Sequence, residues 1–147
     1  MPMTDLLDVP RLLSMTFSEL DEAFGRAESG PIPDGEAKGT AIIAPGTRIN
    51  DELAEFTRIF GWQGKTFDAA HGSLRNRITP FGLNAIVARV YLGPSLLDQR
   101  GCVVLDYSET SLIAHWIRDE IRLIAPKRYL GRVYWAGKAL LHFALEF

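Results

Sequence analysis

The sequence is poor in the residues that form covalent cross-links and metal sites, with one cysteine and three histidines among 147 residues. Cys102 cannot form a disulfide within the chain, and its apolar neighbours predict a small buried residue, which fits a reducing compartment. No histidine has metal-ligand spacing with Cys102 or with another histidine, so no structural zinc site is expected. No cofactor is predicted. A lone histidine can hold haem as an axial ligand, and His115 beside Trp116 is the candidate for that alternative.

Long apolar runs and concentrated charge are also missing. No stretch reaches the roughly 20 apolar residues that a membrane-spanning helix needs. Residues 1–13 carry Asp5 and Asp8 and lack the basic start and apolar run of a secretory signal. The 16 lysines and arginines are scattered, and the formal net charge is −2, which argues against a nucleic-acid partner. We therefore expect a cytoplasmic protein with no membrane span.

The common motifs of nucleotide and acyl-transfer enzymes are absent as well. There is no nucleophile elbow or phosphate loop, and Gly35–Gly39 lacks the third glycine and the following helix of a dinucleotide fingerprint. Ser108 and Ser111 lie near Asp106 and His115, but the residues of a catalytic triad normally come from separate elements. Hydrophobic residues make up 47% and charged residues 23%, which is ordinary for a single soluble domain spanning residues 1–147.

Helical signals occur only in the first half of the chain. Thr16 and Glu19 have the spacing of a capping box and predict a helix that ends at Gly25–Gly30. Asn50 can cap a second helix that ends near Gly61. Residues 1–15 are expected to be a loosely ordered lead-in.

The rest of the chain shows the period-two alternation and glycine-marked turns of antiparallel strands. The segment Ser108–His115 is ambiguous and could be a short helix across a barrel end. Eight strands are predicted: Glu36–Ala44, Trp62–Asp68, Ser73–Thr79, Ala85–Leu92, Gly101–Asp106, Ile117–Leu123, Tyr129–Trp135 and a last strand that ends at Phe147. Because closure removes exposed edges, this pattern favours a mainly β protein, an up-and-down barrel with a packed interior or room for one small ligand.

A family resemblance follows from several short motifs. Trp62-Gln63-Gly64-Lys65-Thr66-Phe67 resembles the tryptophan-glycine-lysine-phenylalanine box of proteins that carry a GXWXG domain followed by a domain of unknown function. The namesake box departs from the pattern, because Ala37 stands at the tryptophan position between Gly35 and Gly39. The second half of the family is resembled by Leu105-Asp106-Tyr107, Ile117-Arg118-Asp119-Glu120-Ile121-Arg122, Tyr129-Leu130-Gly131 and Phe143-Ala144-Leu145. The resemblance implies a calycin-like barrel, similar in architecture to lipocalins, and it implies no particular reaction.

Asp119 is the most informative carboxylate, because alternation puts it on the same face as Ile117 and Ile121. A charge that faces an apolar interior is costly unless it is paired. It is therefore either a polar anchor or an acid with a raised pKa in a cavity, or simply one half of an internal pair with an arginine. Asn76 also falls on an apolar face, and Asp106 either faces the same interior or makes the turn that follows it.

Other polar and aromatic residues have more ordinary roles. Lys65 is expected to point outward and to stack across a barrel end. Arg75 and Arg77 form one outward row, and Arg118, Glu120 and Arg122 form another, whose charges pair across strands for under about 1 kcal/mol each. Tyrosines and tryptophans in a barrel more often plug its ends or pack its core than bind ligand.

The function predicted from this pattern is binding of one small hydrophobic molecule inside the barrel. The predicted ligand-binding residues are Asn76, Asp106, Tyr107, Asp119 and Tyr129. The alternative is an enzyme of the isomerase or cyclase type that uses Asp119 for proton transfer on an apolar substrate. A third hypothesis is an interaction module, such as a homodimer that pairs barrel walls.

Overall fold

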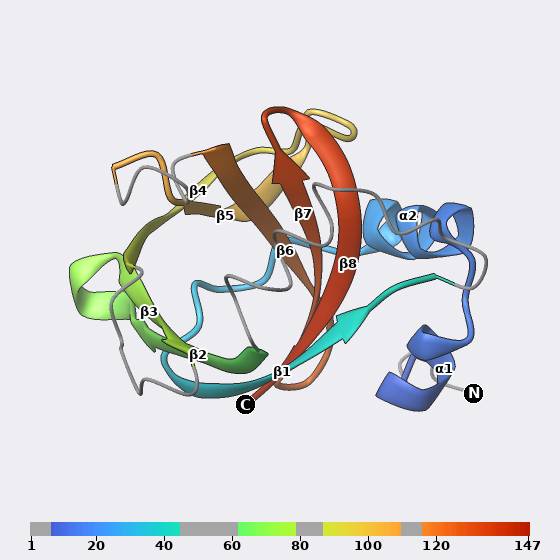
Figure 1. Cartoon of the computed structure of the whole chain (residues 1–147), viewed down its shortest axis with the longest axis horizontal. Helices are drawn as coiled ribbons and strands as arrows, with labels where there is room; N and C mark the ends of the chain where they lie inside the picture. The colour runs from blue at the N-terminus through green and yellow to red at the C-terminus, as the bar shows by residue number, and fades with distance from the viewer. Residues whose placement is uncertain (1–6, 45–61, 79–86, 110–115) are drawn as a thin grey trace.

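The computed structural model describes residues 7–44, 62–78, 87–109 and 116–147, and its strands form a closed antiparallel barrel (Figure 1). Each strand pairs with the next one along the chain, in the order β1 to β8. The barrel closes where β1 (Gly35–Ile42) pairs with β8 (Lys138–Glu146), with Lys38 opposite Glu146 and Ile42 opposite His142. The predicted mainly β, eight-stranded barrel is confirmed.

Most strand bounds lie within a few residues of the predicted ones, and the fourth strand continues past Leu92 to Pro94. The strands Trp62–Asp68 and Gly101–Asp106 have the predicted bounds. A one-turn 3₁₀ helix (Ala69–His71) joins the second strand to the third. The remaining strands are β2 (Trp62–Asp68), β3 (Ser73–Ile78), β4 (Val87–Pro94), β5 (Gly101–Asp106), β6 (Ile117–Ala125) and β7 (Arg128–Trp135).

Two short helices precede the barrel and lie outside it, beside β8 and β1 (Figure 1). In α2 (Phe17–Arg26) the predicted capping box is present, since Thr16 Oγ1 accepts from Glu19 N and Glu19 Oε1 accepts from Thr16 N. The lead-in expected over residues 1–15 is wrong for its described part, because Val9–Leu13 form α1. Asp8 caps α1 and Leu12 is fully buried, so the segment has both a local and a packing reason to be ordered. The helix predicted after Asn50 lies outside the described residues.

The barrel wall separates two apolar layers. The inner layer lies inside the barrel and includes Phe67, Leu105, Ile121, Val133 and Phe143. The outer layer packs both helices against the wall through Leu12, Leu20, Phe24, Ile42, Cys102, Val104, Leu130 and Ala144. Strands of this part of the wall are therefore buried on both faces.

Two of the three residues in the outward row of β6 are buried as a result, and the expectation of solvated surface pairs is wrong for Glu120 and Arg122. Glu120 and Arg122 are both 0% exposed. Arg122 uses all of its N–H donors: it forms a fork with Asp98 at 2.8 and 2.9 Å and also donates to the carbonyls of Phe24, Arg100 and Gly101. The helix layer and the loop between β4 and β5 convert this predicted surface row into a buried network.

A second buried network connects α2 to the wall. Asp21 of α2 accepts from Arg132 Nε at 2.8 Å and lies 2.7 Å from His142 Nε2. Arg132 in turn donates to the hydroxyl of Tyr134.

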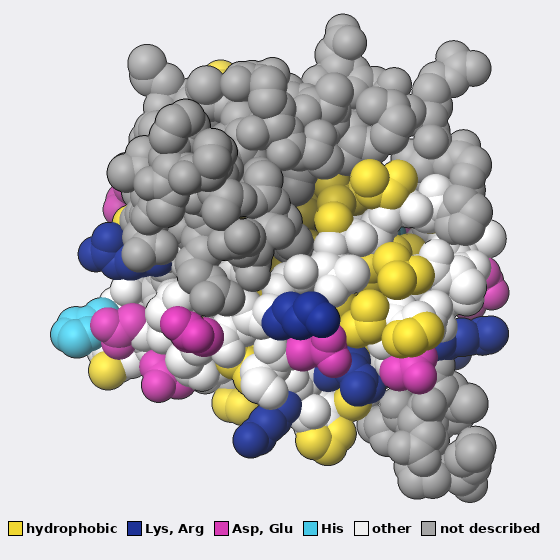
Figure 2. Space-filling model, turned by 60° about the horizontal axis from the view of Figure 1, so that its bottom comes forward, with side chains coloured by type: hydrophobic (Ala, Val, Ile, Leu, Met, Phe, Trp, Pro, Cys, Tyr) yellow, Lys and Arg dark blue, Asp and Glu magenta, His cyan; other side chains and the backbone are white. Residues whose placement is uncertain are grey.

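On the face that Figure 2 turns forward, Lys and Arg side chains are interspersed with Asp and Glu side chains and form no field of one sign.

Candidate functional site

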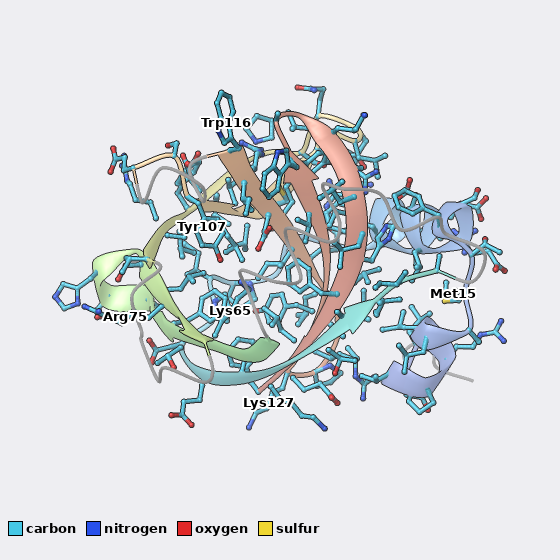
Figure 3. All side chains as sticks on the ribbon, in the orientation of Figure 1. Met15, Lys65, Arg75, Tyr107, Trp116 and Lys127 are labelled. Atoms are coloured by element: carbon cyan, nitrogen blue, oxygen red, sulfur yellow. The ribbon has the colours of Figure 1, made fainter. Side chains whose placement is uncertain are left out.

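Three polar side chains lie together inside the barrel. Lys65 comes from β2, Tyr107 directly follows β5, and Asp119 lies on β6. All three are at most 1% exposed. Figure 3 shows Lys65 and Tyr107 inside the ring of strands, whereas Arg75 and Trp116 point away from it. We refer to Lys65, Tyr107 and Asp119 as the interior triad.

The inward position of Lys65 differs from the prediction that it points outward. A register shift in the pairing of β2 with β3 lies between Trp62 and Gly64, and Gly64 has a φ of 132°, which favours glycine. From Lys65 onward the strand alternates regularly, so Lys65 shares the inner face with Phe67, which belongs to the inner apolar layer. Counting back from Phe67 instead of forward from Trp62 would have found Lys65 from the sequence.

The interior triad is held by short contacts around the lysine amine. Lys65 Nζ donates to the Tyr107 hydroxyl oxygen at 2.8 Å and lies 3.5 Å from Asp119 Oδ2. The same amine lies 5.4 Å from the centre of the Tyr107 ring and 5.7 Å from that of Phe143. Asp119 Oδ1 is buried and has no hydrogen-bond partner among the described residues. The triad therefore contains one strong acceptor that the described part of the chain leaves unsatisfied.

Burial decides the protonation of this pair. Desolvation raises the pKa of Asp119 to about 6, against the opposing attraction of Lys65. Desolvation likewise lowers the pKa of Lys65, although the Asp119 carboxylate opposes the shift. Both shifts disfavour the charged forms, so burial favours neutral Lys65 and neutral Asp119 compared with exposed groups of the same types.

The surroundings of the triad are apolar. Leu105 pairs with Asp119 across β5 and β6, and Val133 pairs with it across β6 and β7. The ring of Phe143 lies so close to Gly131 that a Cβ atom there would come within 2.2 Å of it, so only glycine leaves room for this ring. A few polar groups in an apolar lining are typical of ligand sites.

The structure brings together two of the predicted ligand-binding residues, Tyr107 and Asp119. The predicted inward position of Asp119 is confirmed. Tyr129 also lies in the inner layer, but it pairs with Leu123, four residues along β6 from Asp119, a separation of about 13 Å. Its hydroxyl donates to the carbonyl of Pro31 at 2.7 Å. The backbone of Asn76 pairs with Lys65, and its side chain lies outside the described part of the chain.

The predicted convergence of Asp106 with Asp119 is wrong. Asp106 shares its face with Cys102 and Val104, as expected, but that face is the outer one, which packs against the helix layer. Its carboxylate accepts from Tyr91 Oη at 2.9 Å and from Ser108 N at 2.8 Å. The turn-making alternative therefore describes Asp106, and an apolar face did not mean an inner face because both faces of β5 are covered.

The described residues also form a groove that lies apart from the triad. A groove of about 810 Å³ lies outside the barrel, between α1, α2 and the end of β6, and Met15, Ala23, Leu123 and Ile124 contribute to its lining. None of the predicted ligand-binding residues lines it. The described residues contain no group of three or more His, Cys, Asp or Glu side chains that could hold a metal ion, and His115 lies outside them.

The fold and the triad define an eight-stranded antiparallel barrel with a buried Lys–Tyr–Asp group. Neither a protein-family model nor a curated protein matches the chain. Among solved structures, it is similar to a protein from Thermomonospora curvata, with 19% sequence identity over 90% of this chain and 88% of that chain and a TM-score of 0.66. At this identity the similarity shows the fold alone. In the described residues, no helix is long and apolar enough to cross a membrane.

Proposed function

We propose that the barrel binds one small, mainly apolar molecule that donates a hydrogen bond to Asp119. The observation that carries this proposal is the buried Asp119 Oδ1 without a partner among the described residues. An unsatisfied buried acceptor costs about 1–3 kcal/mol, and more when it is charged. A ligand hydroxyl or amide that met this oxygen would recover that energy.

The rest of the site supports an apolar body for this ligand. The inner layer around the triad consists of aliphatic and aromatic side chains, and burying each CH₂ group of a ligand is worth about 0.8 kcal/mol. Tyr107 and Lys65 already contact each other, so they orient the polar end of the site before a ligand arrives. Tyr129, about 13 Å away along the wall, contributes its ring to the far part of the lining.

The experiment is a calorimetric comparison of hexanol with methyl pentyl ether, which has the same number of heavy atoms and no hydroxyl donor. The wild-type protein should bind hexanol about tenfold more tightly, since a hydrogen bond to a carboxylate is worth about 1.5–3 kcal/mol. Asp119→Leu keeps a side chain of similar shape and should abolish the preference.

The matched control is Asp106→Asn, because Asp106 lies on the outer face of the same wall. This variant should keep the preference for hexanol. Equal affinity of the wild-type protein for the two compounds, or no binding of either, would overturn the proposal.

A second candidate function is proton transfer on an apolar substrate, with Asp119 as the acid or base. It is favoured by the pKa of Asp119 near 6, because a general acid or base works best when its pKa lies near the operating pH. A suitable probe is a β,γ-unsaturated cyclohexenone, whose conversion into the conjugated isomer is followed by ultraviolet absorbance. The proton leaves the carbon between the carbonyl and the alkene and returns at the γ-carbon. Asp119→Asn should remove any acceleration, and an active Asp119→Asn variant would exclude this role.

We make three further proposals, on family, location and oligomeric state. Because of the Trp62–Phe67 box, we propose that the chain belongs to the GXWXG-associated family with a calycin-like barrel. Superposition on a solved member of that family would test this. A cytoplasmic location is proposed because the single cysteine is buried and unpaired. Homodimer formation through the barrel walls is tested by sedimentation at several concentrations.

A further inference from the structure

We propose that Lys65 forms a reversible imine with a small apolar aldehyde or ketone inside the barrel. This inference rests on the proposed ligand-binding function and names a ligand class, carbonyl compounds, and a covalent link. The geometry on which it depends is the interior triad, in which a buried amine lies beside a tyrosine hydroxyl and a carboxylate.

The environment of Lys65 is the one that makes lysine nucleophilic. Only the neutral amine attacks a carbonyl, and a lysine in an apolar site loses its proton more readily than one in water. Burial lowers the pKa of Lys65, and the attraction of the Asp119 carboxylate opposes that shift. The Tyr107 hydroxyl oxygen, 2.8 Å away, accepts a hydrogen bond from the amine and so helps to hold Nζ in place inside the barrel.

Asp119 supplies the proton transfers that imine formation needs. The nitrogen lone pair forms the C–N bond while the carbonyl π pair moves to oxygen. Asp119 takes a first proton from nitrogen and delivers it to that oxygen, which gives the carbinolamine. It then takes the second nitrogen proton and delivers it to the hydroxyl group, which leaves as water as the C=N bond forms. The balance is one amine and one carbonyl compound giving one imine and one water, with no oxidant or reductant. A carboxylate with a pKa near 6 can both accept and return these protons at neutral pH.

The chain offers its own comparison, because it contains four lysines and three of them are exposed. Lys65 is 1% exposed, whereas the exposed ones are Lys38, Lys127 and Lys138. An amine that is protonated in water reacts slowly with an aldehyde near neutral pH, so burial should make Lys65 the preferred site although it is the least accessible of the four.

The experiment is to incubate the full chain with hexanal and cyanoborohydride near pH 7, which reduces the imine to a stable secondary amine. Peptide mapping by mass spectrometry then gives the rate of hexyl addition at each lysine. We expect Lys65 to be labelled at least about tenfold faster than each exposed lysine. Lys65→Met should lose only this label, and Lys138→Met should retain it. The mapping on the wild-type protein gives the answer even if Lys65→Met does not fold.

Hexanol binding to the same protein separates this inference from the proposed function. If hexanol binds and hexanal labels the exposed lysines as fast as Lys65, the imine is excluded and noncovalent binding stands. If neither hexanol binding nor Lys65 labelling is detected, both proposals are wrong. Labelling of Lys65 that free hexanol slows by competition would establish both.

Discussion

Asp119 and Glu120 are consecutive residues of β6, and their side chains lie on opposite faces of the barrel wall. Both carboxylates are buried, at 1% and 0% exposure. Glu120 accepts hydrogen bonds from Ser95 Oγ at 2.7 Å and Leu96 N at 2.9 Å, and it forms an ion pair with Arg118. Asp119 has one contact at 3.5 Å, to Lys65 Nζ, and one oxygen without a partner among the described residues.

This difference distinguishes a structural network, whose acceptors have donors, from a site in which one carboxylate oxygen can still accept a hydrogen bond. On the outer face one backbone amide, a serine hydroxyl and an arginine donate to the carboxylate of Glu120, and such donors stabilise a buried charge. On the inner face the carboxylate of Asp119 is left short of donors, which raises its pKa and keeps an acceptor available. The outer network holds the helices and the β4–β5 loop to the wall, and the inner triad can respond to a ligand.

The largest expected effect follows from breaking the outer network at Arg122. Arg122→Met should lower the free energy of unfolding by about 3–5 kcal/mol, because Asp98 and three backbone carbonyls lose their donors. Urea unfolding measures this change in the free energy of unfolding. The control is Arg26→Met, which removes an exposed pair with Glu22 and should cost under about 1 kcal/mol. Equal effects of the two substitutions would mean that the outer network does not hold the structure.

Removing the charge of Glu120 should also destabilise the protein. Glu120→Gln replaces one of the two acceptor oxygens with a donor amide, which then faces either the Ser95 hydroxyl or the Leu96 N–H and the Arg118 guanidinium, at an expected cost of about 1–3 kcal/mol. Asp119→Asn, one residue earlier, should leave stability at pH 7 unchanged or increase it, because Asp119 is short of donors. Urea unfolding of the two variants side by side measures the contrast, and equal destabilisation would remove it.

The same contrast appears as a pH dependence. The pKa of Asp119 is raised in the folded state from 3.8 to about 6, so the folded protein binds more protons than the unfolded chain between these values. This group therefore makes the protein less stable as pH rises from about 4 to about 6. The stability of Asp119→Asn relative to wild type should increase over that range. A constant difference from pH 4 to pH 7 would show that the pKa of Asp119 is not raised.

The smallest effect is expected at Asp106, where the sequence pattern suggested a ligand contact and the structure shows a turn. Asp106→Asn keeps an oxygen that can accept from Ser108 N, so the free energy of unfolding should change by under about 1 kcal/mol. Hexanol affinity should not change. A loss of affinity would place Asp106 in contact with the ligand after all.

The sequence predicted the barrel because local rules set it: strands alternate with period two, and the turns after Pro126 and at Gly137 are marked by their residue types. It also predicted the inward face of Asp119, since Ile117 and Ile121 on the same strand set the alternation. The sequence pattern does not predict the outer apolar layer. Burial of β5 by the helices is a tertiary contact, and local alternation carries no information about it. For that reason the sequence pattern does not predict the buried surroundings of Asp106 and Arg122 on the outer face.

Lys65 shows a different source of error. The sequence pattern predicts an outward side chain, but a register shift that the sequence marks only by Gly64 lies just before Lys65. One irregular residue reverses the face of every residue beyond it. The internal pair with an arginine, one of the alternatives for Asp119, is in the structure a pair with a lysine.

Titration of the Asp119 carboxyl carbon by ¹³C NMR, with and without hexanol, is the decisive measurement for the proposed ligand site. We expect a midpoint near pH 6 in the free protein and a lower midpoint with hexanol, because a hydroxyl that donates to the carboxylate favours its charged form. A midpoint near 3.8, or one that hexanol leaves unchanged, would contradict the claim that Asp119 is the unsatisfied acceptor of a ligand site.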